Sequence, residues 1–302
     1  MRAVVSTPGT GGVAFSEVPA PQAAANEVLI DVKAISINRG EILNLPGSAE
    51  GWRPGWDVAG VVAADSNGFS AGDRVVALSL ADGSWAEQIA VPADCVAVLP
   101  DEVDFAQAAT LPVAALTALR LVRESGTLLG RRVLVTGAAG GVGRTLVQLA
   151  SAAGAEVTAV ARNAERAKGL DVLGAHTVVD AIEAAQGAFD VIYESAGGTS
   201  LAAALGLIGP GGTVYSYGNS SGETTPVSFF QFFGGHEQAV LRHFVFVTGA
   251  PVGPDLATLA RSVAAGTLRT EISLQDDWEN INAALNAVRE RHVAGKAVLT
   301  LG

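Results

Sequence analysis

The stretch VLVTGAAGGVGRTLVQLASAAGA, residues 133–155, determines how the second half of the chain is interpreted. It begins as an apolar β-like segment, passes through a cluster of glycines and continues with the apolar spacing of a helix. Such glycines let the backbone approach a pyrophosphate, and the helix N-terminus offers it N–H groups and a positive dipole. No Gly-Lys-Ser/Thr follows, so the stretch is not a P-loop. It predicts a dinucleotide site, and the alternative is a connection that only turns the chain. The residues expected to contact the dinucleotide are Ala139, Gly140, Gly141, Val142 and Gly143.

The next apolar segment indicates which dinucleotide is bound. An Asp or Glu at its end, about 20 residues past the glycines, would bind a ribose 2′-hydroxyl, but Ala161 and then Arg162 stand there. Arg166 follows one helical turn later, so both guanidinium groups are expected to face one spot. Guanidinium suits a 2′-phosphate, which favours NADPH as the cofactor. The alternative is two solvated surface arginines, with Glu165 paired to one of them.

Composition excludes several classes of protein. The chain has 302 residues, which favours two domains, and 49% of them are apolar against 16% charged, as in globular proteins. The net charge of −11 argues against nucleic acid as a partner. No apolar run reaches the ~18 residues of a membrane span, and the N-terminus lacks the apolar region of a signal peptide. The single cysteine, Cys95, cannot form an intrachain disulfide and is expected to be buried or half-buried. We expect a cytoplasmic protein that acts on a small-molecule substrate, with neither nucleic acid nor a membrane as a partner.

Two different patterns of apolar and turn residues along the chain indicate two domains. Up to about residue 100, short segments rich in Val, Ile and Ala alternate with turn residues, which predicts a mostly antiparallel β domain. From Arg131 on, strand-like and helix-like segments alternate, which predicts βαβ units and a parallel sheet. Residues 164–174 are expected to form a helix and residues 243–249 a last strand. A further strand at residues 296–301, KAVLTL, is expected to return to the first domain.

The motifs of this chain resemble, in order, those of the medium-chain dehydrogenase/reductase superfamily. The most similar branch is that of the zinc-independent (zeta-crystallin-like) quinone oxidoreductases. The resemblance implies a GroES-like domain over residues 1–108, completed by 266–302, and a Rossmann domain over 109–265. It covers essentially the whole chain and rests, besides the glycine-rich stretch, on SINRGEI (36–42), PGWDVAGVV (54–62), GDRVVAL (72–78), GSWAEQIAVP (83–92), ATLPVAALTALRLV (109–122) and GKAVLTL (295–301).

The chain departs from the superfamily's zinc-dependent members. Those place a Cys in the first catalytic loop and a His-Glu pair in the next segment, where this chain has Asn38 and Trp56 with Asp57. The four-cysteine structural zinc lobe is also missing. The histidines show no close ligand spacing and stand at His176, His236, His243 and His292. We therefore expect no zinc.

The same segments supply candidates for the substrate side of the site. Without a metal, hydride transfer to an electron-poor acceptor needs positioning and a donor for developing oxyanion charge. Asn38 is the candidate for a contact to a substrate carbonyl or a ribose, and its alternative role is to cap a loop. Trp52 and Trp56 are candidates for the wall of an aromatic-binding cleft, with core packing as the alternative. Arg39 and Glu41, in the same loop as Asn38, are expected to form a surface ion pair. Lys296 is expected only to solvate the end of a strand.

The resemblance implies further cofactor contacts. Most of them follow strands at the carboxyl edge of the sheet, where ligands bind in such folds. For each glycine, turn formation is the alternative. The residues are Thr117, Ser195, Ala196, Gly197, Tyr217, Gly218, Asn219, Phe246 and Val247.

These features favour a zinc-independent, NADPH-dependent reductase of quinones or α,β-unsaturated carbonyls. One alternative is an enoyl thioester reductase or a tailoring reductase of secondary metabolism. Some thioester-reducing relatives carry a Tyr proton donor shortly after the first catalytic loop, and residues 43–55 contain none. The other alternative is an NADPH-binding sensor without turnover. The apolar segment 243–249 at a sheet edge predicts a homodimer formed by sheet extension.

Overall fold

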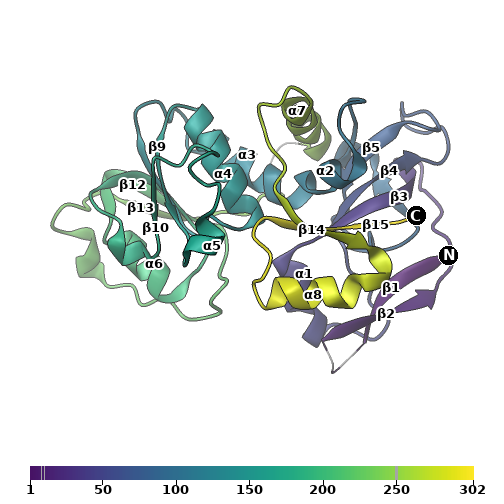
Figure 1. Ribbon diagram of the computed structural model, residues 1–302, viewed down its shortest axis with the longest axis horizontal. Coiled ribbons are helices and arrows are strands. Elements are labelled where there is room, and N and C mark those ends of the chain that lie inside the picture. The colour runs from purple at the N-terminus through teal and green to yellow at the C-terminus, as the bar shows by residue number, and fades with distance from the viewer. Residues whose placement is uncertain (8, 10, 249–250) are drawn as a thin grey trace. The chain divides into compact units, whose positions relative to one another are not determined.

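The computed structural model describes residues 1–302 except 8, 10 and 249–250 (Figure 1). The chain divides into two compact units: unit 1 is Met1–Leu116 with Gly249–Gly302, and unit 2 is Thr117–Thr248. Residues 109–116 and 251–265 thus lie in unit 1, whereas the domain bounds implied by the family resemblance include them in the second domain. Packing explains the difference, because α7 (Val252–Ala264) contacts β7 (Val96–Val98) of unit 1.

Unit 1 is built on a seven-stranded sheet and a separate hairpin. Its other strands are β1 (Arg2–Thr7), β2 (Gly12–Glu17), β3 (Glu27–Ile37), β4 (Asp57–Val62), β5 (Arg74–Leu78), β6 (Gln88–Pro92), β14 (Ile272–Asp277) and β15 (Lys296–Thr300). The sheet order is β14-β15-β3-β4-β5-β7, and β6 pairs with β3. Every pairing in this sheet is antiparallel except that of β14 with β15. The hairpin pairs β1 with β2. The mostly antiparallel domain expected from the sequence is confirmed.

Short helices flank this sheet. They are α1 (Arg39–Asn44), α2 (Phe105–Ala109), α7 and α8 (Ile281–Arg289), the 3-10 turns η1 (Leu45–Gly47), η2 (Ala93–Cys95) and η6 (Trp278–Asn280), and the π-helical turn η3 (Leu111–Ala115). Asp104 caps α2, because its Oδ1 accepts a hydrogen bond from Gln107 N at 2.7 Å. Cys95 is buried, as the sequence indicated. Within the described residues, no helix has the length and apolar character needed to cross a membrane.

The last strand of the chain returns to the first sheet. β15 pairs antiparallel with β3, from Ala297 opposite Ile37 to Thr300 opposite Ala34. β15 is buried over most of its length, as expected for the apolar run KAVLTL between two neighbours. The expected return of residues 296–301 is confirmed, and it makes unit 1 discontinuous in sequence.

Unit 2 is a doubly wound parallel sheet. Its strands are β8 (Arg132–Val135), β9 (Glu156–Val160), β10 (Thr177–Val179), β11 (Phe189–Glu194), β12 (Ile208–Ser216) and β13 (Val240–His243). Its helices are α3 (Leu116–Glu124), α4 (Gly141–Ala152), α5 (Ala164–Ala167) and α6 (Gly198–Leu205), with the 3-10 turns η4 (Ile182–Ala184) and η5 (Phe229–Phe232). The order is β10-β9-β8-β11-β12-β13 with every pairing parallel. The direction of winding reverses between β8 and β11, the point where dinucleotides bind in Rossmann sheets.

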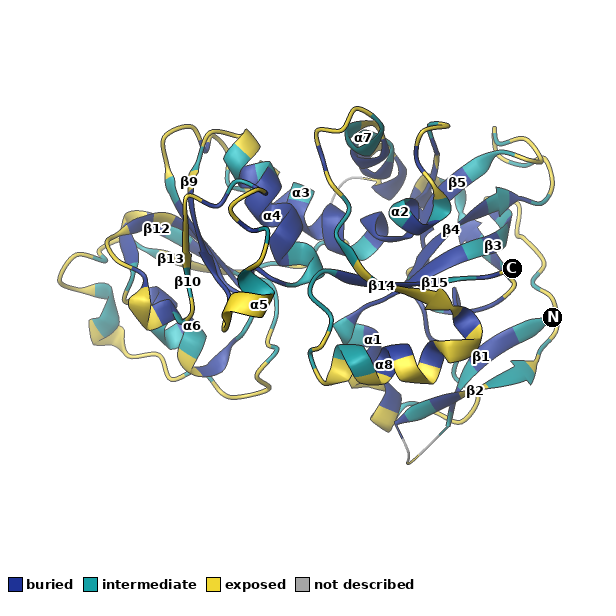
Figure 2. Ribbon diagram, viewed as in Figure 1, coloured by how far each residue is buried: buried dark blue, intermediate teal, exposed yellow. Residues whose placement is uncertain are grey.

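Apolar cores cover both faces of the parallel sheet. Alternate residues of β8 face opposite sides: Val133 and Val135 pack with α3 and α4, and Leu134 packs in the cluster that includes α6. Figure 2 shows the resulting dark band of buried strands in this unit. The continuous apolar run in the sequence therefore reflects burial on two faces.

Two predicted elements differ from the structure. The expected strand 243–249 is wrong for its described residues beyond His243, where β13 ends: Phe244 and Val245 have no regular structure, Phe246 and Val247 form a turn and Thr248 a bend. Its partner β12 ends at Ser216, whose carbonyl accepts the last bond, from Phe244 N, at 2.9 Å. The expected helix 164–174 is shorter as well. α5 ends at Ala167, and Gly169 takes a positive φ of 79° that a helix cannot contain.

Candidate active site

The glycine turn after β8 leaves no room for side chains. A Cβ on Gly143 would lie 2.3 Å from Gly137 O and 2.6 Å from Ala138 Cα, so helix α4 packs directly on the turn. Gly137 has a φ of 59°, and Gly140 caps α4 with extended backbone. Glycine is therefore required by geometry at Gly137 and Gly143. The first N–H groups of α4 have no partner within the helix, which makes this end suited to an anion.

A buried carboxylate fixes the neighbouring loop. Glu194, at the end of β11, is fully buried and accepts hydrogen bonds from Ala196 N at 2.9 Å and Gly197 N at 3.0 Å. The hydroxyls of Ser200 and Thr136 donate to the same side chain at 2.9 and 3.1 Å. Thr136 directly precedes the glycine turn, so Glu194 ties the loop after β11 to the loop after β8. Sequence reasoning missed this residue, although an acid that ends an apolar strand before Ser-Ala-Gly was a usable signal.

The loop after β12 joins the same edge of the sheet. Tyr217 N donates to Glu194 O at 2.9 Å, and a Cβ on Gly218 would lie 3.0 Å from Ser195 O. Burial raises the pKa of the Tyr217 hydroxyl, and a hydrogen bond with Ser195 opposes that shift. The residues expected after β8, β11 and β12 thus lie together at the carboxyl edge of one sheet.

The remaining residues expected at the cofactor lie elsewhere in unit 2. Thr117 is buried near the start of α3. Phe246 is half-buried and Val247 is exposed, in the turn after β13. The Phe246 carbonyl accepts a hydrogen bond from Arg120 Nη1 at 2.6 Å, which fixes this turn to α3. Asn219 is exposed, in the loop after β12.

Positive charge gathers after β9. Arg162 is exposed and Arg166 half-buried, and the charges of Arg162 and Arg144 add to burial in lowering the pKa of Arg166. Glu165 forms an ion pair with Lys168 at 2.6 Å. Arg144, on α4, is the member of this group that sequence reasoning missed. Its position in the sequence indicated burial, because Arg144 stands three residues before Val147 and so lies on the same, buried face of the helix.

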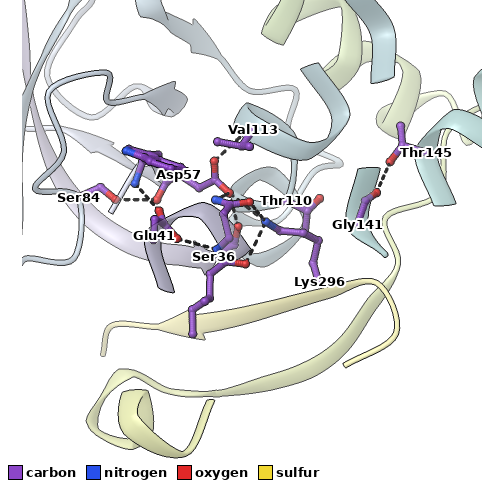
Figure 3. Close-up of polar contacts among 12 residues, drawn as sticks. Ser36, Glu41, Asp57, Ser84, Thr110, Val113, Gly141, Thr145 and Lys296 are labelled. Carbon is purple, nitrogen blue, oxygen red and sulfur yellow. Dashed lines mark hydrogen bonds and ion pairs between the residues drawn. The ribbon is translucent and has the colours of Figure 1, made fainter. Parts of the chain in front are cut away.

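In unit 1, a buried ion pair holds Asn38. Lys296 Nζ lies 3.1 Å from Asp57 Oδ2 (Figure 3). It also lies 2.6 Å from Asn38 Oδ1, and Asn38 Nδ2 donates to Asp57 Oδ2 at 2.7 Å. Ser36 Oγ donates to Asp57 Oδ2 at 2.5 Å, and Val113 N donates to Asp57 Oδ1 at 2.9 Å. Lys296 is 5% exposed and Asp57 0%. The expectation that Lys296 solvates a strand end is therefore wrong.

Glu41 is also buried, which corrects the expected surface ion pair with Arg39. Its carboxylate accepts hydrogen bonds from Asn38 N at 2.6 Å and Trp56 N at 2.7 Å. Burial and the nearby charge of Asp57 raise its pKa from 4.5 to about 8 against these bonds and Lys296. Glu41 thus connects the segments of Asn38 and Trp56, the two places where zinc-dependent relatives carry their ligands.

Trp52 and Trp56 are oriented by one acid. Their indole N–H groups donate to the carboxylate of Asp82 at 3.0 and 2.6 Å. Both rings are half-buried, and a Cβ on Gly40 would lie 2.7 Å from the Trp56 ring. The polar edges of both indoles are therefore held at one point of unit 1. The fully buried tryptophan of this unit is Trp85.

The histidines have separate surroundings. His236 Nδ1 lies 2.6 Å from Ile208 O, while His176 and His292 lie near the acids Glu156 and Glu290. His243 is exposed at the end of β13. Among the residues that the structure describes, no group of three His, Cys, Asp or Glu is arranged to hold a metal ion.

Comparisons with known proteins agree with both units. The family model of the alcohol dehydrogenase GroES-like domain matches residues 24–101, and that of zinc-binding dehydrogenase matches residues 141–260. The quinone oxidoreductase of Sus scrofa is 33% identical over 68% of this chain and 68% of its own length. The quinone oxidoreductase of Rattus norvegicus is 37% identical over 67% of this chain and 66% of its own length. NorB of the spectinabilin polyketide synthase system of Streptomyces orinoci is 32% identical over 97% of this chain, which spans 14% of that protein.

Solved structures match over the full chain. Mycobacterial Rv1454c complexed with NADPH has a TM-score of 0.89 at 26% identity, with complete coverage of both chains. The quinone oxidoreductase of Pseudomonas syringae pv. Tomato DC3000 has a TM-score of 0.88 at 25% identity and covers 99% of each chain.

Proposed function

Because the chain belongs to the medium-chain dehydrogenase/reductase superfamily, in its quinone oxidoreductase branch, we propose that it is a zinc-independent, NADPH-dependent oxidoreductase. We propose that it transfers hydride to a quinone or to an α,β-unsaturated carbonyl. The family matches confirm the resemblance inferred from the sequence. The observation that carries the proposal is the glycine turn of unit 2, followed after β9 by arginines in place of an acid.

The residues of unit 2 fit a dinucleotide diphosphate. Gly143 lets α4 pack directly against the turn at Gly137, and the N-terminus of α4 then offers its N–H groups to an anion at this turn. Arg162 and Arg166 offer the charge that an adenosine 2′-phosphate requires. When bound, the reduced nicotinamide would supply the hydride, and the chain's own residues would bind it and hold the acceptor.

The donor set of unit 1 does not suit zinc. Asn38 and Asp57, which stand where zinc-dependent relatives carry ligands, are both bonded to the ammonium of Lys296. A metal ion there would have to displace this buried cation, and an amide is a poor ligand beside the thiolate and imidazole that zinc prefers. We propose that Asn38 acts instead through its second amide hydrogen, as donor to the carbonyl oxygen of the acceptor.

Steady-state kinetics with NADPH and NADH test the proposal. We expect NADPH to be preferred by at least about tenfold in kcat/KM, since a 2′-phosphate held by charged hydrogen bonds contributes more than about 1.4 kcal/mol. Arg162→Ala combined with Arg166→Ala should abolish that preference. The control Arg131→Ala, an exposed arginine next to β8, should keep it. Equal use of both cofactors by the wild type would refute NADPH dependence.

A second candidate is the reduction of enoyl thioesters. Its support is the match of NorB, a polyketide synthase protein, over 97% of this chain. Against it, residues 43–55 contain no Tyr, and Trp52 in this segment bonds to Asp82. A substrate panel separates the candidates: turnover of a 1,4-quinone or a small enone without turnover of an enoyl thioester favours the first. A wild type that binds NADPH tightly but reduces none of the three would instead favour a sensor.

We further propose that two copies associate through β13. This strand is the edge of its sheet, and Val240 and Leu241 on it are exposed. The dimer strand expected from the sequence was 243–249, and β13 shares only His243 with it. Pairing of two such edges around a twofold axis would continue the sheet across the dimer. Light scattering at micromolar concentration tests this, and a single monomeric peak would overturn it.

A further inference from the structure

Arg144 is a buried cation beside the proposed cofactor site. It follows Gly143 directly on α4 and is 5% exposed. Its Nη2 donates to the carbonyls of Lys168 at 2.9 Å and Arg166 at 3.4 Å. Gly169, the next residue, has a positive φ, and a Cβ on it would lie 3.8 Å from Arg144 Nη1. The guanidinium thus contacts the main chain at the C-terminal end of α5.

These bonds fix the backbone that carries Arg166. Its N–H donates to Asn163 Oδ1 at 3.0 Å, which is the N-cap contact of α5. Its carbonyl accepts from Arg144. α5 spans only Ala164–Ala167, too short to be stable by itself. The position of Arg166 therefore depends on these two side chains, and Arg162 immediately precedes the capping residue.

Three guanidinium charges act on this segment. The pKa of Arg166 is lowered by burial and by the charges of Arg162 and Arg144. The acid in this segment, Glu165, pairs with Lys168, and both side chains are largely exposed. On a chain with a net charge of −11, such an accumulation of positive charge is local. Mutual repulsion of this kind is relieved when an anion binds between the cations.

We propose that Arg144 is a specificity-determining residue for the cofactor's 2′-phosphate, since it positions the segment of Arg162 and Arg166 and adds a third, buried charge to it. The inference rests on the proposed use of NADPH. The ligand chemistry is that of a phosphate monoester dianion on an adenosine ribose. If Arg144 only capped α5, its loss would weaken binding of every adenine nucleotide alike.

Calorimetric titration with two nucleotides separates these roles. Adenosine 2′,5′-bisphosphate and 5′-AMP differ only in the 2′-phosphate, so the ratio of their dissociation constants isolates that group. We expect the full-length wild type to prefer the bisphosphate at least tenfold. Arg144→Met should reduce this ratio by about tenfold while the affinity for 5′-AMP changes less than twofold. Thermal unfolding without nucleotide checks that each variant is folded.

Arg144→Lys serves as a second variant in case the methionine variant does not fold. It keeps the charge but lacks the guanidinium that reaches two carbonyls, so its ratio should fall between those of the wild type and Arg144→Met. An equal loss of affinity for both nucleotides in the lysine variant would overturn the inference and leave a structural cap. A ratio unchanged in both Arg144 variants, yet abolished by Arg162→Ala with Arg166→Ala, would overturn the role of Arg144 alone. A wild type with no preference would refute the use of NADPH itself.

Discussion

Replacement of Lys296 by methionine tests the buried ion pair of unit 1. The ammonium is the cation bonded to Asp57 Oδ2, at 3.1 Å, and it also bonds to Asn38 Oδ1 at 2.6 Å. Methionine keeps most of the side-chain volume and removes the charge. Asp57 would then remain fully buried with only neutral donors among its described partners, Ser36, Asn38 and Val113. Loss of one partner of a buried pair costs about 3–5 kcal/mol, because the other charge is left uncompensated.

Tryptophan fluorescence measures this cost in unit 1 alone. All four tryptophans, at positions 52, 56, 85 and 278, lie in unit 1. With urea as denaturant, a loss of 3–5 kcal/mol should lower the midpoint by roughly 1 to 2 M, at the slopes usual for domains of this size. Lys33→Met on β3 removes the same charge from a half-buried position and should change stability by no more than about 0.5 kcal/mol.

A double-mutant cycle gives the result that would refute the reasoning. Asp57→Asn removes the other charge, so the variant with both substitutions should be more stable than Lys296→Met alone. If the two costs simply add, or if Lys296→Met costs less than about 1 kcal/mol, the ion pair does not stabilise unit 1 in the way the geometry indicates.

Three further expectations follow from individual contacts. Glu41 has its pKa raised from 4.5 to about 8, so its contribution to stability is present below pH 4.5 and is lost as the pH rises through 8. Urea unfolding of the wild type should therefore lose up to about 1.4 kcal/mol per pH unit relative to Glu41→Gln in that window, and parallel pH profiles would contradict this. Gly143→Ala places a Cβ 2.3 Å from Gly137 O, so it should displace the turn and raise the NADPH dissociation constant at least tenfold in calorimetry. Gly211→Ala serves as the control and should keep NADPH affinity, because its Cβ would meet open space and its positive φ of 70° strains only its own backbone. Leu241→Lys should convert a dimer into monomers in light scattering, whereas an unchanged mass would exclude β13 as the interface.

The fold followed from local patterns. Strand and helix periods, together with the glycine turn at 137–143, depend on neighbours close in sequence, and both sheets formed as expected. The return of KAVLTL was predictable for a different reason: an apolar strand needs a sheet, and the antiparallel domain was the one with room for it. The strand expected at 243–249 failed because its length depends on where the partner strand β12 ends, which no local pattern records.

The charged residues of the site were harder to predict. Lys296 and Asp57 are 239 positions apart, so nothing near either one indicates its partner. The burial of Glu41 and Arg144 was not predicted, because isolated charged residues are mostly exposed. Glu41 lies on α1, which has only six residues and so shows no clear periodicity, whereas Arg144 lies on the buried stripe of α4, where its position alone indicated burial. Burial of a charge such as that of Glu41 is thus a tertiary property, and the structure was needed to find it.

The ion pair has a consequence for how unit 1 assembles. Its cation comes from β15 at the C-terminal end of the chain, and its anion from β4 in the N-terminal part. Until β15 pairs with β3, Asp57 lacks that cation and β3 presents an unpaired edge. Contacts over such sequence separations form late, because the loop must close before they contribute. Asn38 bonds to Asp57 within the N-terminal part, but the donor to its Oδ1, Lys296 Nζ, arrives only with β15. It follows that the N-terminal segment alone leaves the substrate side of the proposed site without its buried cation.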